Sequence, residues 1–243
     1  MEHGEHVEAV AREVDALTAA LAGGPASARV PTCPDWTVRD LGNHVGGFCA
    51  FWTHVLCEGT GRSKTPFADP RDDSALPGWF SELGGYLLRE LRATPADTAV
   101  WTWYKPDQSA RFVARRCAHE LSVHRYDAQA ARDACRPIEP PALAVDGIDE
   151  IFDRLVTRRA RTGQAAGQTL HLHGTDDGID AEWLVTLHPD RIEVARTHAK
   201  GDLALRGAVS DLELLLCGRP ALGPVERFGD ESILDLWCRE FRF

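Results

Sequence analysis

Apolar residues in the first half of the chain recur every three or four positions, which is the period of an amphipathic α-helix. In residues 5–21 the repeat consists of Val7, Val10, Val14, Leu17 and Leu21. The Gly-Gly-Pro sequence at 23–25 marks the end of this helix. Thr37 and Asp40 then resemble a capping box, with Asp40 in the position that Glu or Gln usually takes. The predicted second helix has the stripe Leu41, Val45, Phe48, Trp52 and Val55.

Two further helices are predicted over residues 79–93 and 111–131, which completes a four-helix bundle. Residues 30–36 are expected to be irregular, and 101–106 form an aromatic loop. Residues 59–77 form a polar loop interrupted by three prolines, and loops of that length often have a functional role.

The pattern changes after residues 135–141, where three prolines in five positions indicate a linker. Short apolar runs at 170–173, 183–187, 191–195 and 202–206 predict strands, the second and third paired as a hairpin. Helices are expected over 142–161, 209–217 and 231–241. The fold class is therefore α+β, with a four-helix bundle over residues 1–136 and a small α+β domain over 141–243.

Composition narrows the class of protein. The hydrophobic content of 44% is ordinary for a folded domain, and the net charge of −10 argues against nucleic-acid binding. No apolar run approaches the roughly 20 residues of a membrane span, and the first six residues lack a signal-peptide pattern. The seven scattered cysteines form no Cys-x-x-Cys motif, which indicates free thiols in a reducing cytoplasm.

Two polar residues interrupt the inward face of the helix predicted over 111–131. That face consists of Val113, Cys117, Glu120, His124, Ala128 and Ala131. Burying a carboxylate and an imidazole without partners would be costly, and a bound metal ion would remove that cost. The alternative is that Glu120 and His124 pair with Arg116 or Arg125 on a solvated face.

His44 offers a third ligand, because it lies beside the apolar stripe of the second helix and can face the bundle interior. Three protein ligands with a fourth position open are typical of catalytic zinc sites, whereas structural sites are closed by four. His119 lies one position from Glu120 and points about 100° away, so it is not expected to be a ligand.

At this point a family resemblance becomes specific. Residues 33–45 (CPDWTVRDLGNHV) and 118–128 (AHELSVHRYDA) resemble two signatures of the mycothiol-dependent maleylpyruvate isomerase family, a branch of the DinB-like metalloenzymes. Residues 211–220 and 228–230 are similar to the C-terminal domain of that family, which is related to sterol-carrier-protein folds. The resemblance covers nearly the whole chain in the order of the family's domains.

The resemblance implies a divalent metal, typically zinc, held by His44, Glu120 and His124, the same three residues that the helical spacing indicates. Nickel or iron also suits such donors. It further implies that mycothiol fills the open position and that its sulfur adds to a small electrophilic substrate. Cis–trans isomerisation and S-transfer are both open outcomes.

The resemblance also suggests roles for residues around the metal. Arg219 is the candidate catalytic residue for an anionic substrate, although an arginine at the end of a helix is the plain alternative. Metal chemistry, and not the resemblance, makes Asp127 and Arg125 candidate outer partners, because a metal-bound histidine usually donates its other nitrogen to an acceptor. An ordinary salt bridge is the alternative for Asp127.

Other hypotheses remain open. A metal-dependent hydrolase would use water in place of the thiol, and a non-catalytic metal- or ligand-binding protein would use the same fold without turnover. No nucleic-acid or membrane partner is expected, and the chain is expected to be a monomer or homodimer. His171 and His173 share one strand face but are too few for a metal site, which favours an exposed or cleft-lining face. Four tryptophans are expected to pack in the core, with the lining of a substrate pocket as the alternative: Trp36, Trp52, Trp101 and Trp103.

Overall fold

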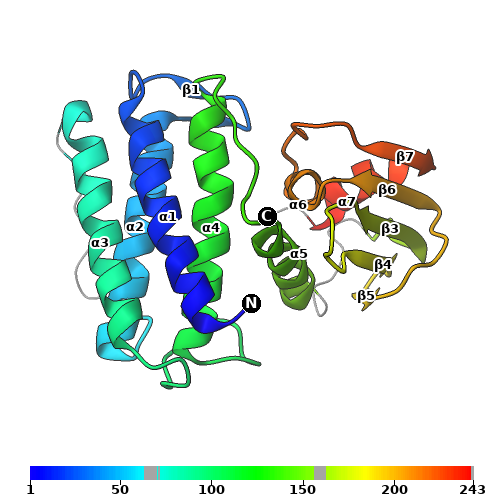
Figure 1. Cartoon of the computed structure of the whole chain (residues 1–243), viewed down its shortest axis with the longest axis horizontal. Coiled ribbons are helices and arrows are strands. Elements are labelled where there is room, and N and C mark those ends of the chain that lie inside the picture. The colour runs from blue at the N-terminus through cyan, green and yellow to red at the C-terminus, as the bar shows by residue number, and fades with distance from the viewer. Residues whose placement is uncertain (63–69, 71, 156–162, 242–243) are drawn as a thin grey trace. The chain divides into compact units, whose positions relative to one another are not determined.

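The computed structural model describes residues 1–62, 70, 72–155 and 163–241. The chain divides into two compact units, Met1–Arg136 and Pro137–Phe243, and each is described here by itself (Figure 1). Within the described residues, no helix has the length and apolar character needed to cross a membrane.

The first unit contains four long helices: α1 (His3–Ala22), α2 (Val38–Glu58), α3 (Leu76–Ala93) and α4 (Ala110–Ala130). Helix α1 packs against α3 and α4, and α2 packs against the same two helices, so the four form a bundle (Figure 1). Its core contains fully buried large side chains from all four helices, among them Leu17, Trp52, Phe80 and Leu121. The predicted bundle is therefore confirmed, and each predicted helix lies within a few residues of the observed one.

The capping box predicted at the start of α2 is present. The backbone N–H of Thr37 donates to Asp40 Oδ2 at 2.8 Å, and the N–H of Asp40 donates to Thr37 Oγ1 at 3.2 Å. These two bonds satisfy backbone donors that a helix terminus otherwise leaves without partners.

Two predictions for the connections of the bundle are wrong. The stretch expected to be irregular contains strands β1 (Arg29–Val30) and β2 (Cys33–Thr37), which pair antiparallel. The predicted loop over 59–77 ends early, because a 3₁₀ turn η1 (Asp73–Ala75) leads directly into α3, with Pro77 in its first turn. Proline suits that position because the first N–H groups of a helix have no intrahelical acceptor. Residues 63–69 and 71 of the predicted loop lie outside the described residues.

The described residues of the second unit form a five-stranded sheet and three helices. The strands are β3 (Gln168–Gly174), β4 (Glu182–Leu187), β5 (Ile192–Ala195), β6 (Leu203–Gly207) and β7 (Glu226–Gly229), and the helices are α5 (Pro141–Leu155), α6 (Val209–Leu216) and α7 (Ser232–Phe241). The sheet order is β5-β4-β3-β6-β7, and only the β3–β6 pair is parallel. The α+β class and the predicted β4–β5 hairpin are confirmed, whereas β7 was not predicted.

Apolar and polar side chains alternate along β3 and β4, and this alternation shows which face of the sheet the helices cover. Leu170 and Leu172 of β3 are fully buried, and so is Trp183 of β4, which is the cross-strand partner of Leu172. The indole N–H of Trp183 donates to Asp149 of α5 at 2.7 Å, so this face packs against the helices. The alternate residues His171, His173 and Glu182 therefore lie on the opposite face. The end of the helix predicted over 142–161 lies outside the described residues beyond Leu155.

Candidate metal centre

Helix α4 carries two of the three predicted ligands. Glu120 and His124 are one turn apart, so their side chains emerge on the same side of the helix. Ser109 caps the start of the helix, its hydroxyl accepting from the backbone N–H of Phe112 at 3.5 Å. Helix α4 is buried around most of its circumference, including Arg116, His119 and Arg125, so the single inward stripe predicted from its sequence is too narrow.

Helix α2 carries the third ligand, His44, close behind the Thr37–Asp40 capping box. Gly46 allows α2 to approach α3 closely, because a Cβ atom there would overlap the ring of Trp79. The cap and the close packing fix the start of α2, and hence the backbone from which His44 extends.

The three side chains meet at one point. His44 Nε2 lies 3.2 Å from Glu120 Oε1, and His124 Nε2 lies 3.4 Å from the same oxygen. The two imidazole rings are 4.8 Å apart at their centroids. One ligand atom from each residue can be chosen so that all three lie within 4.8 Å of one another. Two imidazole nitrogens and one carboxylate oxygen form a donor set that zinc and other first-row divalent ions accept.

Two outer residues orient the candidate ligands. Asp127, which is completely buried, lies with Oδ2 at 2.9 Å from His124 Nδ1. When Nδ1–H donates to this carboxylate, the lone pair of His124 is on Nε2, the atom that faces Glu120. Arg116 donates from Nη2 to Glu120 Oε2 at 2.6 Å, which leaves Oε1 as the oxygen that faces both histidines.

This arrangement changes the acidity of both ligands on α4. Burial opposes ionisation of Glu120, but the Arg116 guanidinium and the hydrogen bonds from His124 and His44 outweigh it and hold the pKa of that carboxyl well below its usual range. Burial likewise disfavours protonated His124, but hydrogen bonds to Asp127 and Glu120 outweigh it and raise its pKa to about 9. A proton and a metal ion therefore compete for this imidazole.

The centre is more accessible than the sequence predicted. The side chain of His44 is 37% exposed, that of Glu120 22% and that of His124 10%. Strand β2 brings the ring of Trp36 to 5.0 Å from the His44 ring and 6.1 Å from the His124 ring, centroid to centroid. His44 thus lies at the rim of the bundle and not in its interior, and Trp36 belongs to the site and not to the core.

Two cysteines near the centre are held as neutral thiols. Cys49 and Cys117 are fully buried, and burial raises the pKa of both, that of Cys49 to about 12. Cys33 of β2 is half-buried, and its thiol donates to Asp127 Oδ2 at 3.7 Å. All seven cysteines lie among the described residues, and none of them is in a disulfide, as predicted.

Other candidate residues lie elsewhere. Arg125 donates from Nε to Glu13 of α1 at 2.8 Å, so it joins two helices of the bundle. His119 packs edge-on against His6, with ring centroids 5.9 Å apart, and it is not part of the His44–Glu120–His124 group.

Arg219 follows α6 in the second unit, where its Nη1 donates to the carbonyl of Cys217 at 2.6 Å. Of the remaining tryptophans, Trp52 is a core residue, whereas Trp101 contacts Phe51 and Trp103 is 45% exposed.

Comparison with known proteins gives the family. The sequence profile of the mycothiol maleylpyruvate isomerase N-terminal domain matches residues 7–129, and the profile of the C-terminal domain of the same enzymes matches residues 142–236. The chain belongs to the mycothiol-dependent maleylpyruvate isomerase family. The family resemblance found in the sequence is thereby confirmed.

Solved structures share the fold of this family member. The crystal structure of the mycothiol-dependent maleylpyruvate isomerase aligns over 93% of both chains with a TM-score of 0.65 and 15% identity. A histidine-to-alanine mutant of that enzyme aligns over 93% of both chains with a TM-score of 0.66 and 14% identity. Among curated proteins, none matches this sequence.

Proposed function

We propose that this chain is a metal- and thiol-dependent enzyme in which His44, Glu120 and His124 hold a divalent ion, with zinc preferred. The observation that carries the proposal is that two imidazole Nε2 atoms converge on one carboxylate oxygen at an accessible position of the bundle. Membership of the family supports mycothiol as the cosubstrate, because the solved enzyme of this fold is described as mycothiol-dependent.

Each residue of the centre has a defined task in this proposal. His44 and His124 would each bind the ion through Nε2, and Glu120 would bind it through Oε1 while Arg116 holds the other oxygen. Asp127 keeps His124 in the tautomer that ligation requires. When bound, the metal lowers the pKa of a coordinating thiol, so that the nucleophilic thiolate forms at neutral pH. Cys49 and Cys117 are unsuited to that task because burial keeps them neutral, which favours a thiol from outside the chain.

The reaction we propose begins when the thiolate sulfur adds to the cis double bond of a small electrophile and forms a C–S bond. Rotation about the resulting single bond and elimination of the same thiolate give the trans product. In an S-transfer the C–S bond would persist. Arg219 is our candidate for binding an anionic group of the substrate. The free cysteines agree with a reducing cytoplasm as the location.

Turnover of maleylpyruvate by the zinc-loaded protein tests this function. We expect an absorbance change that requires both zinc and mycothiol and that falls to background in His44→Ala. The matched control is His54→Ala, on the same helix, where His54 Nε2 lies near the carbonyl oxygen of Arg62 and away from the centre. Circular dichroism would verify that both variants fold.

The products distinguish the reaction types. Mass spectrometry of the mixture shows an unchanged substrate mass for isomerisation and an added thiol mass for S-transfer. Turnover of an ester or amide without any thiol would instead support the hydrolase. A wild-type protein that binds zinc but consumes neither maleylpyruvate nor a generic electrophile in the presence of mycothiol would overturn the proposal.

A further inference from the structure

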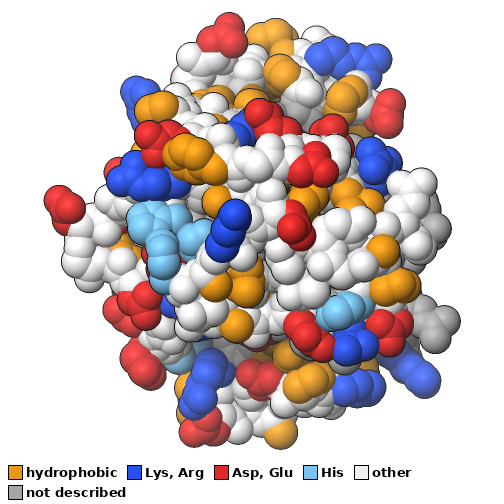
Figure 2. All heavy atoms as spheres, turned by 90° about the vertical axis from the view of Figure 1, so that its right-hand side faces the viewer, with side chains coloured by type: hydrophobic (Ala, Val, Ile, Leu, Met, Phe, Trp, Pro, Cys, Tyr) orange, Lys and Arg blue, Asp and Glu red, His pale blue; other side chains and the backbone are white. Residues whose placement is uncertain are grey.

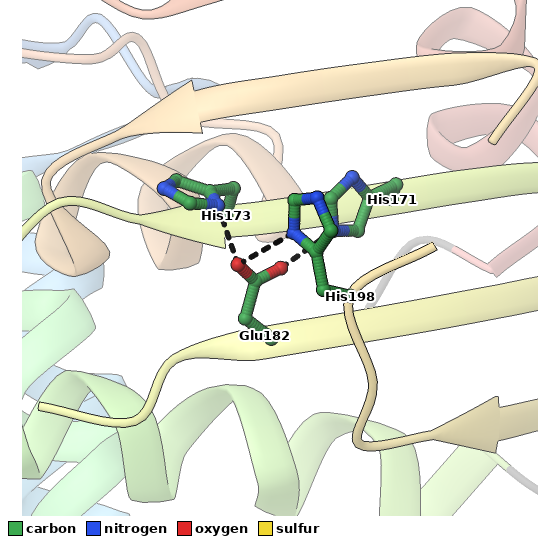
Figure 3. A group of neighbouring side chains, drawn as sticks. All are labelled: His171, His173, Glu182 and His198. Carbon is green, nitrogen blue, oxygen red and sulfur yellow. Dashed lines mark hydrogen bonds and ion pairs between the residues drawn. The ribbon is translucent and has the colours of Figure 1, made fainter. Parts of the chain in front are cut away.

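A second group of potential metal ligands lies in the other unit, on the sheet face opposite the helices. His171 and His173 come from β3, Glu182 comes from β4, and His198 comes from the connection between β5 and β6 (Figure 3). His171 Nε2 lies 2.6 Å from Glu182 Oε2, and His173 Nδ1 lies 2.5 Å from Oε1. His198 Nδ1 lies 3.0 Å from that same Oε1. Three imidazoles therefore surround one carboxylate.

The register of the strands explains how three of these residues meet. His173 and Glu182 are direct cross-strand partners in the antiparallel β3–β4 pair, and His171 is two positions away on the same face. The sequence predicted that the two histidines share a face, and the register confirms it. His171 is only 5% exposed, so the exposed alternative is wrong for this residue.

The connection between β5 and β6 supplies the fourth residue. These strands are separated by β4 and β3 in the sheet, so residues 196–202 must cross both to reach β6. Gly201 lies so close to β3 that a Cβ atom there would be 2.9 Å from the backbone nitrogen of His171. This approach brings the crossing chain onto the open face, and His198 reaches the carboxylate from it (Figure 3).

The composition of the group favours a metal over a simple ion-pair cluster. Three imidazole rings and one carboxylate gather here, and each of the four groups can offer a lone pair to a divalent cation. Imidazole nitrogen with carboxylate oxygen is a donor set for zinc and related ions.

We propose that His171, His173, Glu182 and His198 form a second metal site, which binds a divalent transition ion such as Zn²⁺ with four protein ligands. One ligand atom can be chosen from each residue so that all four lie within 4.8 Å of one another. A tetrahedron with bonds of about 2.0–2.2 Å separates its ligands by about 3.3–3.6 Å. The contacts of 2.5–3.0 Å to Glu182 would therefore lengthen on binding, and any separation near the 4.8 Å limit would shorten by about 1 Å. His198 can supply much of that movement, because its side chain is 75% exposed.

Four protein ligands close the coordination shell, which is the arrangement of structural zinc sites. The second site therefore has a different role from the three-residue centre of the bundle, and it does not rest on the proposed enzymatic function. A bound ion would fasten the crossing segment 196–202 to strands β3 and β4. Figure 2 shows a group of histidine side chains at the surface on this side of the molecule, which gives an ion a path of entry.

Metal titration of the full-length chain tests the site. The protein is stripped with a chelator, and zinc is added in competition with a chromophoric chelator to count the bound equivalents. We expect two equivalents in the wild type, one in Glu120→Ala, and none in a variant that combines Glu120→Ala with His171→Ala and His173→Ala. His188→Ala is the matched control, because His188 lies in the same unit but near Glu193, outside the group.

His198→Ala guards against a variant that fails to fold, because this exposed side chain can be removed without disturbing the core. In the Glu120→Ala background it should weaken zinc binding by more than the roughly 10–100-fold that loss of an outer partner causes. Zinc should also raise the melting temperature of Glu120→Ala, and this increase should vanish when His198→Ala is added.

The site is disproved if the Glu120→Ala protein binds no zinc, or if it binds zinc equally well with and without His171, His173 and His198. A wild type that binds one equivalent, retained in Glu120→Ala, would instead support the second site and contradict the first. Failure of one site is thus distinguishable from failure of the other.

Discussion

Glu120 shows what sequence spacing can and cannot predict about a single residue. The four-residue step from Glu120 to His124 fixes their shared side of a helix, and the position of His44 on a second helix made it a plausible third ligand. The sequence left open whether Glu120 pairs with Arg116, and in the structure it does so through Oε2 while Oε1 faces the histidines. The ion pair with Arg116 and the approach to the histidines therefore both occur, each at a different oxygen of Glu120. Which oxygen faces which partner depends on tertiary packing and not on spacing.

The His124–Asp127 contact makes a prediction at the scale of one residue. Asp127→Asn keeps the size of the side chain but removes the charge that stabilises the required tautomer of His124. We expect about 10–100-fold weaker metal binding at the first centre, with little change in the helical circular dichroism spectrum. Zinc competition titration of this variant in the His198→Ala background isolates the first centre. Unchanged affinity would show that Asp127 has no role in orienting the ligand.

Elements were predicted well where the hydrophobic pattern was long and regular. The bundle helices and strands β3 to β6 follow from the 3.6-residue and two-residue periods. Strands β1, β2 and β7 escaped prediction because they are short and largely exposed, so no alternating pattern marks them. The consequence for the candidate sites is concrete, because β2 carries Trp36 to the first centre. No local pattern could indicate that the crossing segment would bring His198 to the second group.

The capping box of α2 gives a prediction at the scale of an element. The Thr37 hydroxyl and backbone N–H donate to Asp40 and lower its pKa. Such a carboxylate stabilises the fold above the unfolded pKa of about 3.9, and its contribution is lost as the pH falls through the lower folded value. Thr37→Ala should cost about 1 kcal/mol of unfolding free energy at pH 7.

Part of that cost should disappear in acid, because Asp40 then becomes protonated in both proteins. Urea denaturation at pH 7 and below about pH 4 measures the difference in unfolding free energy between the wild type and Thr37→Ala at each pH. The effect of Thr37→Ala should narrow at the lower pH but not vanish, since the Asp40 N–H to Thr37 hydroxyl bond does not titrate. A difference that grows in acid would contradict this account of the cap.

At the scale of the whole molecule, the chain combines two units that follow the domain order of its family. The change in hydrophobic period after the proline-rich stretch was enough to predict the α+β class and the bundle. The first centre groups three candidate ligands, and the second group has four. This difference in ligand number gives the two proposed metal sites different roles. A coordination shell with three protein ligands admits a thiol or substrate, whereas a shell with four protein ligands does not.

The central claim is that an external thiol binds a metal held by His44, Glu120 and His124. The most direct measurement is the absorption spectrum of the cobalt-substituted protein during titration with mycothiol. We predict that a sulfur-to-cobalt charge-transfer band grows and saturates in the wild type and in the combined His171→Ala and His173→Ala variant, and that it is missing in Glu120→Ala. A cobalt spectrum that mycothiol leaves unchanged would contradict the claim, as would a band that persists in Glu120→Ala.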